Sequence, residues 1–251
     1  LTFSAQRMAG LLGGKSQQET SPPDEGFFWR FDRFGYVQHV DMETLQGLAE
    51  DLEGEIWLDV RPGSFATKNA PIGLIRSESE PTEEQWKKLM QCLTVGSDRS
   101  YGTDPRFAMI VLAEIAARAL SPAVNDPGTA IAVLTIELEL FHMWAENDRK
   151  TKERESPKFD RLYVPEITAE DLLFDAFTPI ARDGASMIEV CLRLQKALRA
   201  LMHMDHPGLK KAAESYRELA LELSDQALPV ASQKKTLAEF ARRPLTGHPP
   251  E

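Results

Sequence analysis

The sequence predicts an α+β protein in which a small β-containing N-terminal unit is followed by a mostly α-helical bundle. Between residues 36 and 75, short stretches alternate apolar and polar side chains with the period of two that is typical of half-buried strands. After residue 82, apolar residues recur every three or four positions, which is the period of an amphipathic helix. We therefore divide the chain into a linker over residues 1–26, a small β/α unit over 27–78, a helical domain over 79–242 and a loose tail over 243–251.

The N-terminal unit follows a segment with linker chemistry, in which Gly13-Gly14 is flexible and Pro22-Pro23 is stiff. The alternating residues 36–40 predict a strand, and Asp41 is expected to cap a helix that follows it. Further strands are expected at 56–60, 65–67 and 71–75, around a turn at 61–64. So small a unit is not stable by itself, so we expect it to pack on the helices that follow.

Helix starts in the second part are marked by capping residues. Thr82 precedes two glutamates, and Asp104 and Asp126 each precede a proline, the residue favoured at the first helical position. The segment 148–158 is highly charged and predicts a surface loop. After the helix that begins at Thr82, helices are predicted at about 105–120, 127–147, 168–181, 185–203, 208–226 and 231–241.

Composition and cysteine count limit what the chain is expected to bind. The chain has 39 acidic and 29 basic side chains, and its net charge of -10 repels nucleic acid, which we do not expect to bind. The two cysteines, Cys92 and Cys191, lie in apolar stretches, which predicts buried free thiols in a reducing compartment rather than a disulfide framework. We expect no cofactor and no bound transition metal.

The apolar residues do not predict a membrane span. The longest apolar run, 107–120, is interrupted by Glu114 and Arg118 and is shorter than the ~20 residues that a span requires. The chain starts at Leu1 without an initiator Met or the pattern of a signal peptide. We therefore expect it to be a fragment of a longer protein.

Two polar motifs are distinctive: Asp104-Pro105-Arg106-Phe107, and the segment from Ala119 to Ala130 that reads Ala-Leu-Ser-Pro-Ala-Val-Asn-Asp-Pro-Gly-Thr-Ala. With residues 35–38, 60–65 and 177–180, they resemble bacterial predicted membrane proteins of domain-of-unknown-function family 2254. The resemblance covers most of residues 35–200.

The resemblance implies membrane-spanning helices ahead of this part, so the chain's first partner would be its own missing transmembrane region. The parent protein would then lie in the bacterial inner membrane. The cysteines and the charge favour the cytoplasmic face for this water-facing portion. The resemblance implies no reaction, substrate or catalytic residue.

The most suggestive polar cluster lies between two apolar helices and consists of Arg118, Ser121, Asn125 and Asp126. One interpretation is a pocket for an unknown small molecule, with Arg118 contacting an anion. The other is structural, with Asp126 as a helix N-cap that pairs with Arg118 in a buried corner. Asp104 and Arg106 stand ~24 Å away along the helix and are expected to cap its other end.

Histidines give weaker signals. Glu139 and His142 have the spacing of two metal ligands on a helix, but no second such pair exists, so we interpret them as part of a polar stripe. His203 and His206 precede Pro207-Gly208 and are interpreted as helix-capping residues.

No sequence signature of catalysis is recognisable, and the catalytic residues, if any, are unknown. The function that these observations favour is a sensory, regulatory or assembly role, through protein contacts or a small ligand. The alternative is an enzyme that uses Asp126 or His142; its reaction is unknown, and hydrolysis is one candidate. Because residues 107–120 are apolar almost all round, we also expect the chain to form homo-oligomers.

Overall fold

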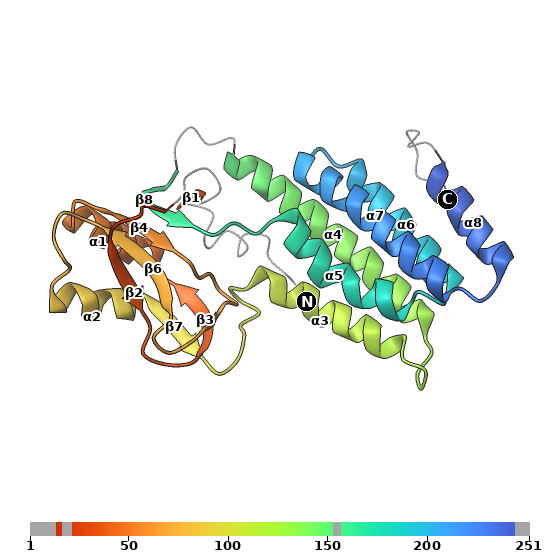
Figure 1. Cartoon of the computed structure of the whole chain (residues 1–251), viewed down its shortest axis with the longest axis horizontal. Helices are drawn as coiled ribbons and strands as arrows, with labels where there is room; N and C mark the ends of the chain where they lie inside the picture. Colours follow the sequence, from red (N-terminus) through yellow and green to blue (C-terminus); the bar gives the residue numbers. More distant parts are fainter. Residues whose placement is uncertain (1–13, 17–21, 153–156, 244–251) are drawn as a thin grey trace. The chain divides into compact units, whose positions relative to one another are not determined.

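A computed structural model describes residues 14–16, 22–152 and 157–243, which form two compact units (Figure 1). Unit 1 comprises residues 1–107 and 150–166, and unit 2 comprises 108–149 and 167–251. Unit 1 therefore includes α2 (Glu83–Gln91), β7 (Leu93–Gly96) and β8 (Phe159–Val164).

Unit 1 contains two sheets. The five-stranded sheet has the order β1-β8-β4-β6-β2, formed by Gly14–Ser16, Phe159–Val164, Glu55–Leu58, Pro71–Arg76 and Phe27–Arg30. β8 pairs in parallel with β1 and β4, whereas β4 with β6 and β6 with β2 are antiparallel. The antiparallel three-stranded sheet has the order β5-β3-β7, in which β5 is Phe65–Ala66 and β3 is Gly35–Val40.

The strands predicted at 36–40, 56–60, 65–67 and 71–75 are confirmed, as is α1 (Met42–Asp51), whose cap Asp41 accepts a hydrogen bond from Thr44 N at 3.0 Å. β2, β7 and β8 were not predicted. These three strands form because they bury apolar side chains: Trp29 of β2, Leu93 of β7 and Leu162 of β8. The three side chains belong to one core, which also includes Leu45, Ile56, Ile75 and Leu89. The α+β class is confirmed.

Unit 2 is helical. Its elements are α3 (Pro105–Ala119), whose first turn belongs to unit 1, α4 (Pro127–Lys152), α5 (Ala169–Asp183), α6 (Ile188–Met202), α7 (Pro207–Ala227) and α8 (Ala231–Arg242). All six lie where helices are predicted. The main difference is that α4 continues to Lys152, through part of the segment that charge alone assigned to a loop.

The linker and tail assignments fall largely outside the described residues. Residues 1–13, 17–21 and 244–251 are not described, and Gly14–Ser16 forms β1. Within the described part of the chain, one helical segment, Pro127–Thr151 of α4, is long and apolar enough to cross a membrane, and 44% of its most apolar window is buried. A core helix can have the same length and composition, and α4 contributes the buried side chains of Leu134 and Phe141 to unit 2.

The two cysteines are buried and free, as predicted. Burial raises the pKa of both thiols, to about 12 for Cys92. Since the thiolate is the nucleophilic form of cysteine, neither thiol is activated for chemistry at neutral pH.

Candidate anion-binding site

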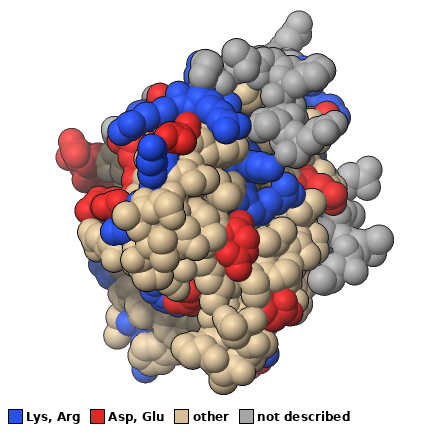
Figure 2. Space-filling view, turned by 90° about the vertical axis from the view of Figure 1, so that its right-hand side faces the viewer, with Lys and Arg blue, Asp and Glu red and all other residues tan. Residues whose placement is uncertain are grey.

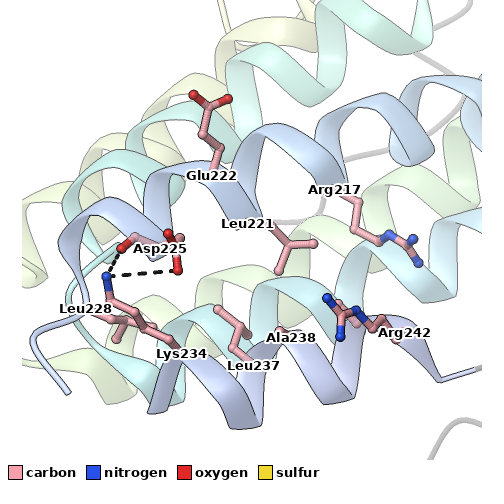
Figure 3. A pocket seen from close by; sticks show the side chains of 10 residues that line it. Arg217, Leu221, Glu222, Asp225, Leu228, Lys234, Leu237, Ala238 and Arg242 are labelled. Atoms are coloured by element: carbon pink, nitrogen blue, oxygen red, sulfur yellow. Dashed lines mark hydrogen bonds and ion pairs between the residues drawn. The ribbon is translucent and has the colours of Figure 1, made fainter. Parts of the chain in front are cut away.

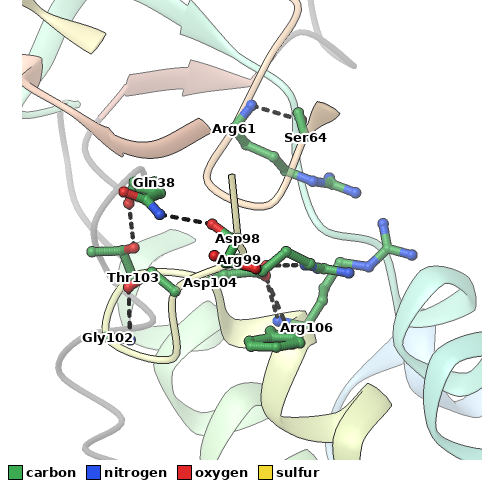
Figure 4. Close-up of polar contacts among 11 residues, drawn as sticks. Gln38, Arg61, Ser64, Asp98, Arg99, Gly102, Thr103, Asp104 and Arg106 are labelled. Carbon is green, nitrogen blue, oxygen red and sulfur yellow. Dashed lines mark hydrogen bonds and ion pairs between the residues drawn. The ribbon is translucent and has the colours of Figure 1, made fainter. Parts of the chain in front are cut away.

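Three segments of unit 1 meet around the side chain of Asp104, which is 1% exposed. They are the turn at residues 61–64 after β4, the loop at 97–103 after β7, and the first turn of α3 (Figure 4). Arg61, Arg99, Asp104 and Arg106 from these segments are called the Asp104 site below.

The Asp104 carboxylate is satisfied by a helix cap and a cation together. Oδ1 accepts hydrogen bonds from the backbone N–H groups of Arg106 at 3.1 Å and Phe107 at 3.2 Å, as an N-cap residue does. Oδ2 accepts a hydrogen bond from Arg99 Nε at 2.6 Å. A buried carboxylate is tolerated in proteins when it is both paired and hydrogen-bonded in this way.

The turn at 61–64 approaches this carboxylate closely because residue 63 is glycine. Gly63 has a φ of +94°, and a Cβ atom at this position would lie 2.3 Å from Asp104 Oδ2. Two backbone hydrogen bonds hold the turn on β3: Gly63 N to Val37 O at 2.8 Å and Val37 N to Ser64 O at 2.9 Å. Because glycine has no Cβ atom, Gly63 allows the turn to approach the Asp104 carboxylate this closely, which a residue with a side chain would prevent.

Further hydrogen bonds fix the loop at 97–103 and the turn at 61–64. Gln38 of β3 donates from Nε2 to the carbonyl oxygen of Asp98 at 2.7 Å, and the Gln38 carbonyl oxygen accepts from the Thr103 hydroxyl. Arg61 donates from its backbone N–H to Ser64 Oγ at 3.0 Å and from its guanidinium to the Glu166 carbonyl oxygen. These hydrogen bonds therefore hold both segments in place beside Asp104.

Three guanidinium groups, those of Arg61, Arg99 and Arg106, extend toward the same side of the cluster (Figure 4). Arg99 also lies over the ring of Phe107, 5.2 Å from its centroid, which limits its orientation. The planar guanidinium group matches carboxylate and phosphate oxygens in a bidentate geometry. All three groups lie beside the buried carboxylate of Asp104, in a chain whose net charge is -10.

The corner predicted as a ligand site, Arg118 to Asp126, has a different character. Arg118, Asn125 and Asp126 are exposed and Ser121 is half-buried, so the corner is not the buried place expected from the sequence. Ser121 Oγ donates to the Arg118 carbonyl oxygen at 2.7 Å. In the described residues, Arg118 forms no ion pair with Asp126, because the connection between α3 and α4 is exposed to solvent.

The predicted N-cap role of Asp126 is confirmed. Oδ1 accepts from Thr129 N at 3.2 Å, and Oδ2 accepts from Thr129 Oγ1 at 2.6 Å. These hydrogen bonds, first that of the Thr129 hydroxyl, lower the pKa of the Asp126 carboxyl below its usual value. Binding of a ligand by Arg118, Ser121, Asn125 and Asp126 stays a prediction.

The predicted polar stripe on α4 lies at the surface. Glu139 is exposed, and His142 Nε2 lies 3.7 Å from Glu146 Oε1, one turn further along the helix. Across residues 14–16, 22–152 and 157–243, no group of three His, Cys, Asp or Glu side chains is placed to hold a metal ion.

His203 and His206 both cap helices, but at different ends. His203 is the C-cap residue of α6. His206 is the N-cap of α7, where Nδ1 accepts from Leu209 N at 3.1 Å and Nε2 lies 2.9 Å from Asp148 Oδ2. The sequence assigned His206 to the end of the preceding helix; the proline that follows it marks the start of the next one.

Sequence reasoning identified Asp104 and Arg106 only as helix-capping residues and did not identify Arg61 or Arg99. One available signal was that residues 35–38, 60–65 and 104–107, which carry the family resemblance, all contribute to this cluster. Arg99 has no such signal, because it stands in an ordinary polar loop.

This chain is similar to bacterial proteins that are predicted to lie in membranes. The chain belongs to the family described as "Predicted membrane protein (DUF2254)", which matches residues 6–200. Uncharacterized proteins of Mycobacterium bovis and Mycobacterium tuberculosis are each 30% identical to it over 118 residues, covering 45% of this chain and 23% of the relative. The matched segment therefore spans less than a quarter of those relatives' length. No solved structure matches the chain significantly.

Proposed function

We propose that this chain is the water-facing part of a bacterial inner-membrane protein with a sensory or regulatory role, and that a small anionic molecule binds at the Asp104 site. The observation that carries the proposal is the projection of three guanidinium groups from separate segments toward one side of a buried carboxylate. The ligand class is a phosphate or a carboxylate, which arginine recognises best.

The geometry favours the Asp104 site over the corner at residues 118–126. A ligand site needs groups that converge from several elements and are held in place. The corner is a single exposed connection, and both oxygens of Asp126 already accept hydrogen bonds from Thr129. At the Asp104 site, the Arg99 side chain is 20% exposed and is fixed against both Asp104 and Phe107.

The alternative function, an enzyme that uses Asp126 or His142, has less support. A general base at neutral pH is favoured by a pKa near 7, and the hydrogen bonds of Asp126 move its pKa in the opposite direction. His142 is exposed on α4 and lies next to Glu146. No observation in the described residues places either side chain in a cleft.

The proposed location is the cytoplasmic face of the inner membrane, which is consistent with two free, buried thiols. Self-association is also proposed, since apolar side chains remain exposed on the helices of unit 2, among them Ile115, Ile136 and Phe174. Sedimentation of the 251-residue chain at micromolar concentration tests it, and a strictly monomeric species would contradict it.

Calorimetric titration of the 251-residue chain with inorganic phosphate and with succinate tests the anion site. We expect one or both to bind at low ionic strength, and Arg106→Gln to weaken that binding at least tenfold. Arg33→Gln is the matched control, because Arg33 is an exposed arginine of unit 1 whose ion pair is with its neighbour Asp32 and whose guanidinium lies over the ring of Phe31. Equal binding by all three proteins, or no binding by the unsubstituted chain, would refute the proposal.

A further inference from the structure

A groove of about 360 Å³ lies between α7 and α8 in unit 2 (Figure 3). Its volume is in the range of natural small-molecule sites, roughly 300–1,000 Å³. The groove is lined on one side by Leu221 and Leu228 and on the other by Leu237 and Ala238. Leu228 and Leu237 belong to a buried cluster with Cys191, so the apolar lining is part of the packed unit.

The two ends of the groove differ in charge. At one end, Lys234 lies 4.0 Å from Asp225 Oδ1 and also donates to the Asp225 carbonyl oxygen, so its charge is compensated. At the other end stand Arg217 and Arg242 (Figure 3). Neither forms an ion pair within the described part of the chain, and the Nε atom of Arg217 is buried without a hydrogen-bond partner there.

Further positive charges lie near Arg217 at this end of the groove. Arg199 is 8% exposed and donates to the Arg243 carbonyl oxygen at 2.7 Å. Burial lowers the pKa of Arg199, and the positive charges of Arg217 and Arg243 lower it further. The face of the molecule drawn in Figure 2 shows grouped basic side chains beside a broad uncharged area. An anion placed between Arg217 and Arg242 would therefore relieve repulsion as well as gain hydrogen bonds.

We propose that the groove binds a single-chain anionic amphiphile, a fatty-acid carboxylate, with the head group between Arg217 and Arg242 and the hydrocarbon along Leu221, Leu237 and Ala238. The apolar lining excludes a free inorganic anion as the preferred ligand, because such an ion leaves most of the groove unfilled. The uncompensated arginine end equally disfavours a neutral or cationic amphiphile. The inference is independent of the Asp104 site, which lies in unit 1.

The test is calorimetric titration of the 251-residue chain with decanoate, with decanol and decyltrimethylammonium as neutral and cationic probes of the same length and acetate as the head group alone. We expect decanoate to bind at least tenfold more tightly than the other three. Arg242→Gln and Ala238→Phe should each reduce decanoate affinity at least tenfold, the first by removing the cation and the second by filling the groove.

Arg182→Gln is the matched control, since Arg182 is an exposed arginine of unit 2 that pairs with Asp183. It should leave decanoate binding unchanged, and circular dichroism should show that all three variants keep the helical content of the original chain. Equal affinity for decanoate and decanol, failure of decanoate to bind, or full binding by both groove variants would overturn the proposal. Arg106→Gln should leave decanoate binding unchanged even if it abolishes phosphate binding, so each proposal can be refuted without the other.

Discussion

Two helices of this protein, α3 and α4, begin with the same dipeptide, Asp-Pro, and the two aspartates have opposite surroundings. Asp104 is 1% exposed and accepts hydrogen bonds from two backbone N–H groups and from Arg99. Asp126 is exposed and accepts hydrogen bonds from the backbone and the hydroxyl of Thr129, three residues further along the same helix. The dipeptide therefore determines the local backbone, whereas the environment of the carboxylate is determined by what the rest of the chain packs against it.

This difference separates a structural cap from a candidate site. The Asp126 cap is complete within four residues and needs no distant partner. The Asp104 cap depends on a glycine turn some 40 residues earlier in the sequence and on a loop that Gln38 holds to β3. Long-range assembly of this kind places charged groups from separate segments together, which is what binding of a small ligand requires.

The largest expected effect is that of Asp104→Ala. Removal of this carboxylate deletes the cap of α3 and leaves the half-buried Arg99 without its partner, so we expect the free energy of unfolding to fall by about 3–5 kcal/mol. Asp104→Asn, which keeps an oxygen for the cap, should lose less. Urea denaturation of both variants and of Asp126→Ala is the measurement. Equal losses for Asp104→Ala and Asp126→Ala would contradict the comparison.

A third carboxylate, Glu137 of α4, sharpens the comparison because it is fully buried and neither of its oxygens has a hydrogen-bond partner in the described residues. Burial, with a smaller effect from the charge of Asp175, raises its pKa from 4.5 to about 9. The folded chain then holds a proton that the unfolded chain has released. Its contribution to stability is therefore complete below pH 4.5 and is lost as the pH rises toward 9.

Glu137→Gln should remove this pH dependence, since the amide does not ionise. We expect the variant to match the original chain near pH 4 and to exceed it at pH 8 by a few kcal/mol. Thermal unfolding at both pH values measures the difference. The same stability increment at pH 4 and pH 8 would show that Glu137 does not titrate in this range.

How far the sequence predicts this protein depends on whether a signal is local. The capping residues Asp41, Thr82 and Asp126 all form the predicted caps, because a cap involves only the next few residues. β8 was missed because its place is defined by pairing with β4 about a hundred residues earlier, which no local pattern encodes. The cluster of Arg61 and Arg99 with Asp104 was missed for the same physical reason.

Two glycine substitutions, one beside Asp104 and one beside Asp126, should differ in their effect on stability. Gly63→Ala forces a φ of +94° on a residue with a side chain and places a Cβ atom against Asp104 Oδ2, so we expect a loss of at least about 1–3 kcal/mol from backbone strain. Gly128→Ala, in the first turn of α4, meets only Asp126 Oδ1 at 3.2 Å and should change stability by less than about 1 kcal/mol. Chemical denaturation of both variants decides it.

The smallest effect concerns the corner at residues 118–126. Asp126→Ala should cost about 1 kcal/mol, the usual value of a lost N-cap, and no more, because Arg118 is exposed and forms no ion pair with Asp126 among the described residues. A double-mutant cycle with Arg118→Ala should therefore give a coupling energy close to zero. The lowered pKa of Asp126 adds a pH signature: the cap's contribution is present above the unfolded pKa and is lost as the pH falls through the folded pKa. A coupling well above zero, or a phosphate affinity that depends on Asp126 but not on Arg106, would move the ligand site from the Asp104 site to this corner.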